Sequence, residues 1–211
     1  MYNRVMSQKW QRRKDQRPLE ILFAALNLFV SKGFASTRIE DIAKQANVSK
    51  GTVYLYFSSK EDLFKKMVHE VMVPKINEVE EYISSYQGSQ SELLQQVIRH
   101  WWKTIKESGL IGVPKLIIAE ADKFPDLTRF YMKEVIHRIQ SILMNILDKG
   151  QKKKEFKAMD TVLTTRVIMS SLVYFSMWDI SLKKYDKKNL NVDDLIEQQI
   201  LLLLTGIKNE K

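Results

Sequence analysis

The sequence predicts an all-α protein: a small N-terminal unit of three helices joined to a larger C-terminal helical bundle, with about nine helices in total. Three observations support this fold class. Apolar residues recur at helical spacing over most of the 211 residues. The chain has only 7 glycines and 4 prolines, too few for the many tight turns of a β-sandwich or barrel. Hydrophobic residues make up 45% of it, enough to bury a core.

The first predicted helix begins at Pro18, because a residue without an amide hydrogen suits the first turn of a helix. Apolar residues at positions i, i+3, i+4, i+7 and i+8 mark one buried face between Ile21 and Phe29. Gly33 ends this helix as a left-handed residue. Residues 1–16 are polar and basic without an apolar period, which predicts a flexible arm.

Two short helices follow, joined by a tight turn. Thr37 and Glu40 form a capping-box pattern that opens the first of them. Asn47, which tolerates the left-handed conformation, ends it. Ser49 caps the second, which runs to about Phe57. Because so short a turn cannot hold the pair antiparallel, the helices cross steeply and the second presents one face outward. The pattern predicts a helix-turn-helix over about residues 38–57, inside a domain of residues 17–75.

The remaining residues, 76–211, are predicted to form a second helical domain. A long helix runs into it from residue 60, with a kink or break at Pro74. Further helices are predicted over residues 92–107, 114–123, 125–149, 160–184 and 193–208, separated by short polar or glycine-containing segments.

The net charge of +9 is unevenly distributed. Residues 1–60 contain 11 Lys and Arg against 4 Asp and Glu, a net charge of +7, and the rest of the chain has a net charge of only +2. A basic head on a nearly neutral body suggests that the head contacts a polyanion. Charge alone leaves a merely solvated basic surface as an alternative.

Several function classes lack their usual residues. There is no cysteine, so disulfides, thiolate metal sites and cysteine nucleophiles are excluded. His69, His100 and His137 are scattered and form no metal-ligand spacing with acidic residues. No phosphate-binding loop or nucleophile motif is present. We therefore expect no enzyme activity, no metal and no cofactor.

No segment has the length of a membrane span. The longest apolar stretches, residues 167–178 and 200–204, fall short of the roughly 20 residues that a bilayer requires. The first residues lack the apolar run of a signal peptide. We expect a soluble, cytoplasmic protein without a membrane partner.

The head resembles the DNA-binding domain of the TetR family of bacterial transcriptional regulators. The resemblance is carried by the run Val48-Ser49-Lys50-Gly51-Thr52-Val53-Tyr54-Leu55-Tyr56-Phe57 with the following Ser59-Lys60-Glu61, and by Ala25, Phe29, Gly33, Phe34, Ile42 and Ala43 before it. Asn47 stands where the family usually has glycine, and it supplies the same backbone geometry. The resemblance implies a repressor that binds a palindromic operator as a homodimer and is released by a small apolar or cationic effector.

The residue types fit contact with double-stranded DNA. A recognition helix needs apolar residues behind it and short or hydrogen-bonding residues in front, so that it can enter the major groove. By resemblance, one group contacts the phosphate backbone and the other lies nearest the bases. The first group is Thr37, Arg38, Tyr54 and Lys60, and the second is Lys50, Gly51, Thr52, Leu55 and Tyr56. Arg12, Arg13 and Arg17 of the arm either contact DNA or are solvated.

The same resemblance assigns ligand binding and dimerisation to residues 76–211. Aromatic and methionine side chains suit a pocket for apolar ligands, although any one of them singly is more often a core residue than a pocket residue. The pocket prediction names Trp101, Trp102, Phe130, Tyr131, Met169, Tyr174 and Trp178. The predicted dimer interface lies on the last two helices, at Ile196, Ile200, Leu203, Leu204 and Ile207, with burial inside one subunit as the alternative.

A rival hypothesis is a helical ligand-binding or scaffold protein whose basic head docks on another protein or on anionic lipid. Its binding to DNA would be weak, independent of sequence and abolished by modest salt.

Overall fold

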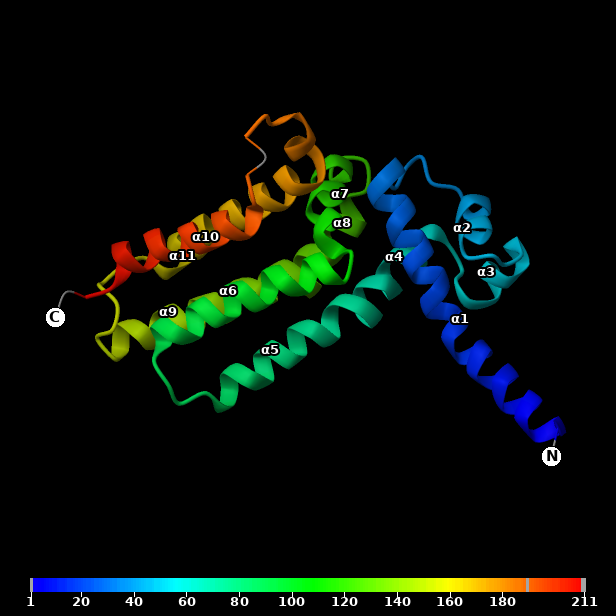
Figure 1. The fold of residues 1–211 in the computed structure, drawn as a ribbon, viewed down its shortest axis with the longest axis horizontal. Helices are drawn as coiled ribbons and strands as arrows, with labels where there is room; N and C mark the ends of the chain where they lie inside the picture. The colour runs from blue at the N-terminus through cyan, green and yellow to red at the C-terminus, as the bar shows by residue number, and fades with distance from the viewer. Residues whose placement is uncertain (1, 189, 210–211) are drawn as a thin grey trace.

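The computed structural model describes residues 2–188 and 190–209. It contains eleven α-helices that form nine continuous helices, because π-helical turns over Val68–Met72 and Met132–Ile136 join α4 to α5 and α8 to α9 (Figure 1). The predicted all-α fold is confirmed. The helices are α1 (Tyr2–Lys32), α2 (Ile39–Gln45), α3 (Lys50–Tyr56), α4 (Lys60–Met67), α5 (Val73–Ser85), α6 (Gln90–Glu107), α7 (Val113–Glu120), α8 (Pro125–Tyr131), α9 (His137–Lys152), α10 (Thr161–Met177) and α11 (Val192–Ile207).

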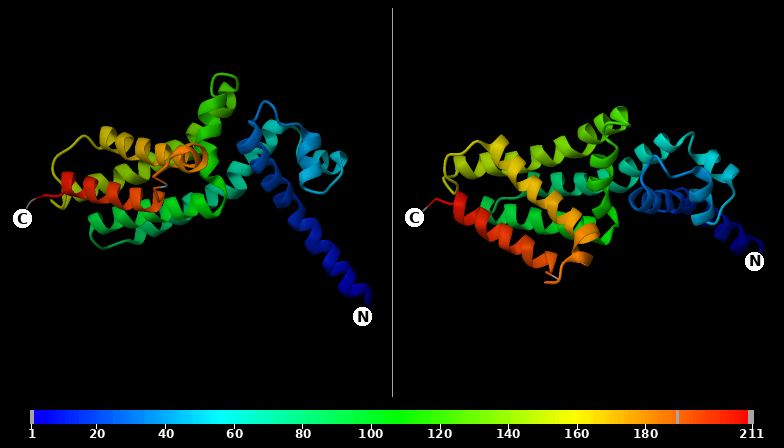
Figure 2. Two further views of the ribbon diagram at one scale, coloured as in Figure 1. Left: turned by 45° about the horizontal axis from the view of Figure 1, so that its top comes forward. Right: turned by 90° about the horizontal axis from the view of Figure 1, so that it is seen from above.

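The prediction of a flexible arm over residues 1–16 is wrong for the described part of that segment. Helix α1 begins at Tyr2 and projects from the head in both views of Figure 2. Residues 2–17 contain neither glycine nor proline and are rich in Arg, Lys and Gln, which have high helix propensity. A helix that is already nucleated extends through such a segment without an apolar face. Pro18, predicted to start the helix, therefore lies inside it.

Aromatic packing forms the centre of the head. The rings of Phe29, Phe34 and Phe64 lie with their centroids 5.0 to 6.5 Å apart, and all three side chains are fully buried. Phe124, from the segment between α7 and α8, adds a fourth ring, 4.7 Å from Phe34 and nearly perpendicular to it. The core of the head is therefore continued by a residue of the body.

Helices α6 and α9 pack together in the body, with α5 against both of them. Helix α10 packs on α9, and α11 packs on α10 and α6 (Figure 1). Helices α7 and α8 lie at the end of the bundle next to the head, where α7 contacts α1 and α8 contacts α4. Two connections thus link head and body: the continuous helix α4–α5 and the α7–α8 segment.

The predicted interruption near Pro74 is confirmed. The helix that starts at Lys60 passes through a π-helical turn over Val68–Met72 immediately before α5, which has Pro74 in its first turn. Proline cannot donate the hydrogen bond that a regular helix needs at this position, so the ladder must adjust there.

Candidate nucleic-acid interface and ligand pocket

Helices α2 and α3 form the predicted helix-turn-helix. The turn between them contains Asn47 with a φ of 53°, in the left-handed region, and the Val48 amide donates to the Ala43 carbonyl at 2.9 Å. The Ser49 hydroxyl accepts from the Thr52 amide at 3.1 Å and so caps α3, as predicted. Apolar residues behind the two helices hold them on the head core: Ile42, Ala43, Val53 and Phe57 are buried.

The opposite face of α3 is presented to solvent. Leu55 is 73% exposed and Tyr54 is 48% exposed, which is unusual for large apolar or aromatic side chains in a packed head. Lys50 and Gly51 are also exposed, whereas Thr52 and Tyr56 are half-buried. Arg38, at the start of α2, is exposed as well. A short helix with an exposed face that carries a lysine, a tyrosine and a glycine fits the major groove of DNA.

Lys50 is paired with a carboxylate. Its Nζ lies 2.5 Å from Glu40 Oε1 of α2 and 5.8 Å from the centre of the Tyr54 ring. The hydrogen bond with Lys50 holds the pKa of Glu40 below its ordinary value and raises the pKa of Lys50. Both groups are exposed, so the pair is weak, and a phosphate or a guanine can replace Glu40 as the partner of Lys50.

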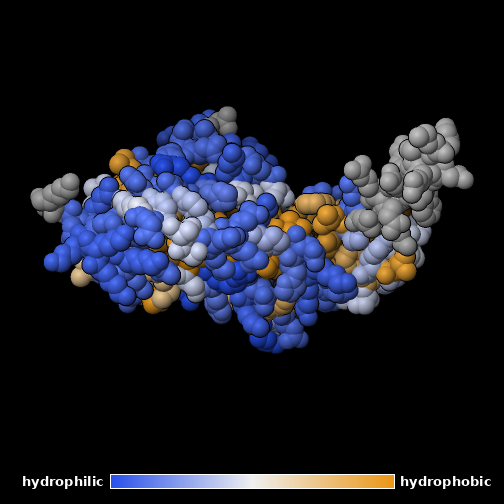
Figure 3. All heavy atoms as spheres, turned by 90° about the horizontal axis from the view of Figure 1, so that it is seen from below, coloured by the Kyte–Doolittle hydropathy of each residue, from blue (hydrophilic) through white to orange (hydrophobic). Residues whose placement is uncertain are grey.

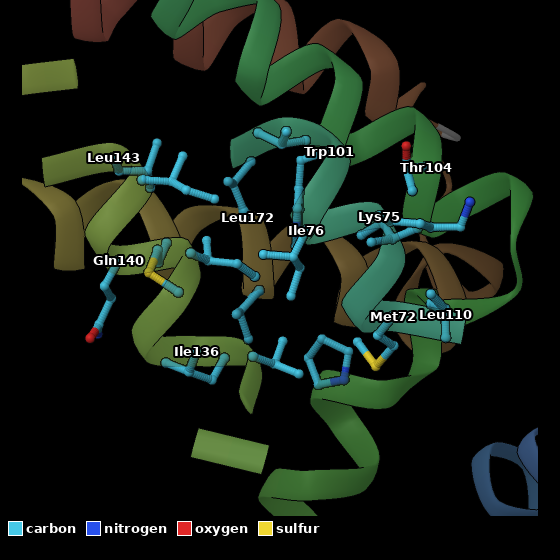
Figure 4. A pocket seen from close by; sticks show the side chains of 18 of the residues that line it. Met72, Lys75, Ile76, Trp101, Thr104, Leu110, Ile136, Gln140, Leu143 and Leu172 are labelled. Carbon is cyan, nitrogen blue, oxygen red and sulfur yellow. The ribbon is translucent and has the colours of Figure 1, made fainter. Parts of the chain in front are cut away.

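A cavity of about 570 Å³ lies inside the body. Its wall is formed by α5, α6, α7, the α8–α9 helix and α10, and most of the lining side chains are apolar (Figure 4). The size is within the range of small-molecule sites. Tyr131 belongs to this wall, and burial raises the pKa of its hydroxyl group, which therefore stays protonated at neutral pH. The cavity suits the hydrocarbon part of a ligand.

The described part of the chain has no cluster of side chains that suits a metal ion and no helix that suits a bilayer. No group of three or more His, Asp or Glu side chains is arranged there to hold a metal ion. None of the described helices combines the length and apolar character that crossing a bilayer demands.

Comparison with known proteins identifies the family of both the head and the body. Residues 21–67 match the profile of bacterial regulatory proteins of the tetR family, and residues 92–201 match that of the C-terminal domain of AefR-like transcriptional repressors. The second match alone covers more than half of the chain. The chain belongs to the TetR family. It is a DNA-binding transcriptional regulator.

Relatives of the chain are similar over its whole length. The fatty acid metabolism regulator protein of Bacillus subtilis is 28% identical over 201 residues, which cover 93% of this chain and 100% of that protein. FadR of Bacillus subtilis, solved in complex with stearoyl-CoA, aligns with a TM-score of 0.69 and 24% identity over 90% of this chain and 98% of that one. The ketosteroid regulator KstR2 of Mycobacterium tuberculosis aligns with a TM-score of 0.73 and 21% identity, covering 92% and 96%. The two solved structures show the TetR fold.

Thr37, predicted from the TetR resemblance to contact phosphate, is only 2% exposed. Its hydroxyl donates to the Gly33 carbonyl at 2.7 Å and lies 3.3 Å from that of Leu28. The predicted capping box is therefore wrong: Arg38 is the N-cap residue of α2, without a side-chain cap. Gly33, with a φ of 88°, turns the chain and leaves buried carbonyls at the end of α1, and Thr37 satisfies them.

Lys60, also predicted to contact phosphate, faces the head instead. Its Nζ donates to the carbonyls of Phe34, Ala35 and Thr37 at 2.6, 3.1 and 3.0 Å and lies 4.6 Å from the centre of the Phe34 ring. A lysine with three carbonyl partners stabilises the loop between α1 and α2 and is not free for DNA. Nothing in the local sequence distinguishes this role from a surface lysine.

Three of the seven residues predicted for the pocket line it: Trp101, Tyr131 and Met169. The prediction is wrong for the other four. Trp102 points toward α11, where its Nε1 donates to Asp193 at 2.7 Å. Phe130 packs on His69 and Lys65, and Tyr174 and Trp178 pack on each other. Composition identifies aromatic residues but does not reveal which side of a helix faces the cavity.

The sequence analysis missed most of the cavity wall. Met72, Ile76 and Val79 of the α4–α5 helix line it, as do Ile117 and Ile118 of α7. The helical period of Ile76 and Val79 is visible in the sequence, but it indicates only a buried face. The polar lining residues, Lys75, His100, Thr104, Gln140, Arg166 and Ser170, have no sequence signal at all.

The predicted dimer residues of α11 are mostly internal. Ile196, Ile200 and Leu204 are between 2% and 8% exposed within one subunit, so they cannot form an interface, and Leu203 and Ile207 are half-buried. The alternative of internal burial is thus correct for the first three. The exposed large apolar side chains of the last two helices are Val162, Leu163, Val167 and Tyr174 of α10 with Leu201 and Leu202 of α11.

Proposed function

We propose that this TetR-family regulator is a homodimeric repressor that binds a palindromic operator through α3 and leaves it when an amphipathic ligand with a long hydrocarbon part enters the cavity of the body. The observation that carries the proposal is the combination of two separate sites in one chain. One is the exposed polar face of α3, and the other is the closely lined apolar cavity of about 570 Å³.

For the DNA site, we propose Arg38, Lys50, Gly51, Thr52, Tyr54, Leu55 and Tyr56 as the contact residues. Lys50 and Tyr54 are the strongest members, because both are exposed and both have hydrogen-bonding groups at the tip of a long side chain. One helix-turn-helix buries too little surface for tight specific binding, which favours two heads on a two-fold site.

For the effector, the chemistry of the cavity favours an acyl chain. Most of the lining consists of aliphatic and aromatic side chains, and burying a hydrocarbon chain against them is favourable because it removes apolar surface from water. A similar protein of Bacillus subtilis is a fatty acid metabolism regulator, and FadR of that organism binds stearoyl-CoA. We therefore propose a long-chain acyl compound, such as an acyl-CoA, as the effector.

We propose that α7 couples the two sites. Pro114, Ile117 and Ile118 of α7 line the cavity. At the end of the same helix, Glu120 is buried and its Oε1 accepts from the Ala35 amide of the α1–α2 loop at 3.2 Å. A ligand that shifts α7 displaces this contact and favours a different position of the head. The ligand then lowers the affinity for DNA by the difference between its own affinities for the two conformations.

Selection of bound fragments from a random DNA pool, followed by anisotropy titration of the recovered site, tests the proposal. We expect a palindrome, and release of the protein from it by acyl-CoA with a dependence on chain length. Weak binding that is independent of sequence and lost at modest salt would favour the rival role of docking on protein or lipid. Release by no acyl compound would reject the proposed effector while leaving the DNA site intact.

A further inference from the structure

The polar groups of the cavity are segregated at its two ends. Lys75 of α5 and Thr104 of α6 lie together on one side, and Gln140 of α9 lies on the opposite side, with apolar side chains such as Ile76 and Leu172 between them (Figure 4). His100, one helical turn before Thr104, belongs to the first end, and its Nε2 lies 3.4 Å from the Thr104 hydroxyl. A ligand in this cavity therefore meets Lys75 and Thr104 at one end and Gln140 at the other.

The two ends differ in how their cations are engaged. Arg166 is exposed, and with the Gln140 amide oriented so that its oxygen faces α10, that oxygen accepts from Nε and Nη1 of Arg166 at 3.2 Å each. Lys75 is half-buried, and it forms no ion pair with any carboxylate of residues 16–188 or 190–209, whose side chains the structure describes. Lys75 is thus a cation without an ion pair among these side chains, beside a mostly apolar cavity.

The Lys75 ammonium group can recognise an anionic group of a ligand. An ammonium group that is paired with no carboxylate is available to an incoming anion, and the charge-assisted hydrogen bonds between the two are stronger than those to a neutral group. The neighbouring Thr104 hydroxyl and the His100 ring offer further hydrogen bonds to the same group. At the other end the cation of the lining, Arg166, is engaged by the Gln140 oxygen, and most of the remaining lining is apolar.

We propose that Lys75 is the specificity-determining residue of the cavity and that it selects amphiphiles with an anionic head group. The head lies at the Lys75–Thr104 end, and the hydrocarbon chain runs past Ile76 toward Gln140. This inference rests on the proposed function, since it assigns an end and a charge to the proposed acyl ligand. The anion is the carboxylate of a free fatty acid or the phosphate-bearing head of an acyl-CoA, two sources of the same chemistry.

The test compares three ligands with the same chain on the full-length protein: myristate, myristoyl-CoA and the neutral myristyl alcohol, measured by displacement of a fluorescent fatty-acid probe. The variants are Lys75→Met, which keeps the length of the side chain without the charge, and Arg166→Met as the matched control at the other end. For Lys75→Met we expect a loss of affinity of about tenfold or more for an anionic ligand and no change for the alcohol.

Retained binding of the alcohol shows that the variant is folded and its cavity intact. A loss confined to myristate identifies a free acid as the ligand, and a loss confined to myristoyl-CoA identifies the CoA head; either supports the inference. Equal affinities of Lys75→Met and wild type for both anions would overturn it, as would a larger loss in Arg166→Met. If the wild-type protein binds none of the three, the proposed acyl effector itself is rejected, which is a distinguishable result.

Discussion

At the scale of single residues, the side chains on the exposed face of α3 differ in role from those that make internal contacts in the head. Lys50, Tyr54, Thr37 and Lys60 all belong to the segment that resembles TetR proteins. Only the first two are presented to solvent, whereas Thr37 and Lys60 satisfy carbonyl groups of the α1–α2 loop. Residues of one motif therefore divide into those proposed to contact DNA and those that hold the α1–α2 loop in place.

Replacing Lys50 or Tyr54 by alanine should weaken operator binding at least tenfold, because each loses a contact to DNA. The melting temperature should change little, since both side chains are largely exposed. Anisotropy titration at fixed salt and thermal unfolding measure the two effects. Lys103→Ala, an exposed lysine of α6, is the control. Unchanged affinity in both variants would contradict the assignment of α3.

Asp193, in the first turn of α11, should make the stability of the body depend on pH. Hydrogen bonds from Lys106 and from Trp102 hold the pKa of Asp193 below its ordinary value of 3.8. A lowered pKa in the folded state adds stability above the ordinary value, and this stability is lost as the pH falls through the lowered one. Asp193→Asn should therefore be less stable than wild type at pH 7, by urea unfolding, with a difference that shrinks below about pH 4. A difference independent of pH would show that the charge of Asp193 does not matter.

At the scale of elements, the loop between α1 and α2 connects the recognition unit to everything else. Thr37 and Lys60 satisfy its carbonyls, Phe34 inserts into the aromatic core, and Glu120 of α7 accepts from its Ala35 amide. A loop with so many buried partners is rigid, so the position of α2 and α3 follows that of α1 and α7.

Lys60→Met should lower the free energy of unfolding by about 2 kcal/mol, because three carbonyl groups lose their donor. Loss of DNA affinity should then follow the loss of folded protein. Lys44→Met, an exposed lysine of α2, should be close to wild type in stability. Weaker DNA binding by Lys60→Met with an unchanged melting temperature would instead show that Lys60 contacts DNA directly.

At the scale of the whole molecule, the distribution of exposed apolar residues accounts for the expected dimer. In the view of Figure 3 most of the body surface is hydrophilic, and hydrophobic residues gather nearer the head. On α10 and α11, large apolar side chains such as Val167, 68% exposed, and Leu202, 64% exposed, face solvent. We propose that a second copy covers these side chains in a two-fold dimer, which is the symmetry that a palindromic site requires.

Leu202→Glu should convert the dimer to monomers, because a carboxylate in the centre of an apolar interface is desolvated without a partner. Analytical ultracentrifugation measures the change. Leu55→Glu, an equally exposed leucine on α3, is the matched control and should remain a dimer while losing DNA binding. A Leu202→Glu protein that is still dimeric would place the interface elsewhere.

Glu120→Ala should separate ligand binding from DNA release. A typical coupling of 1–3 kcal/mol corresponds to a change in DNA affinity of roughly 5- to 150-fold on ligand saturation. Without the contact from Glu120 to Ala35, we expect this factor to approach one, while the affinity for acyl-CoA stays near that of wild type. Glu107→Ala, an exposed glutamate of α6, is the control. Full ligand response in Glu120→Ala would show that the coupling runs through the α4–α5 helix alone.

The sequence by itself determined most of the helices, although not the first half of α1, together with the helix-turn-helix and the exposed face of α3. These depend on local signals: helical apolar periods, a left-handed Gly33 and Asn47, and the Ser49 cap. It also identified Trp101, Tyr131 and Met169 of the cavity, although only by residue type.

Only the tertiary structure decided which side of each helix meets which neighbour. In the folded chain Ile196, Ile200 and Leu204 are buried, and Lys60 donates hydrogen bonds to the α1–α2 loop. Trp102 donates to Asp193 of α11, and Lys75 lies at one end of the cavity. An apolar period indicates that one face of a helix is buried, but it does not indicate which element packs against that face. A lysine in a sequence likewise does not show whether its ammonium group contacts water, backbone carbonyls or a ligand. The partner of a side chain is fixed by segments far away in the sequence, and for this reason the functional pocket could be located only in the folded molecule.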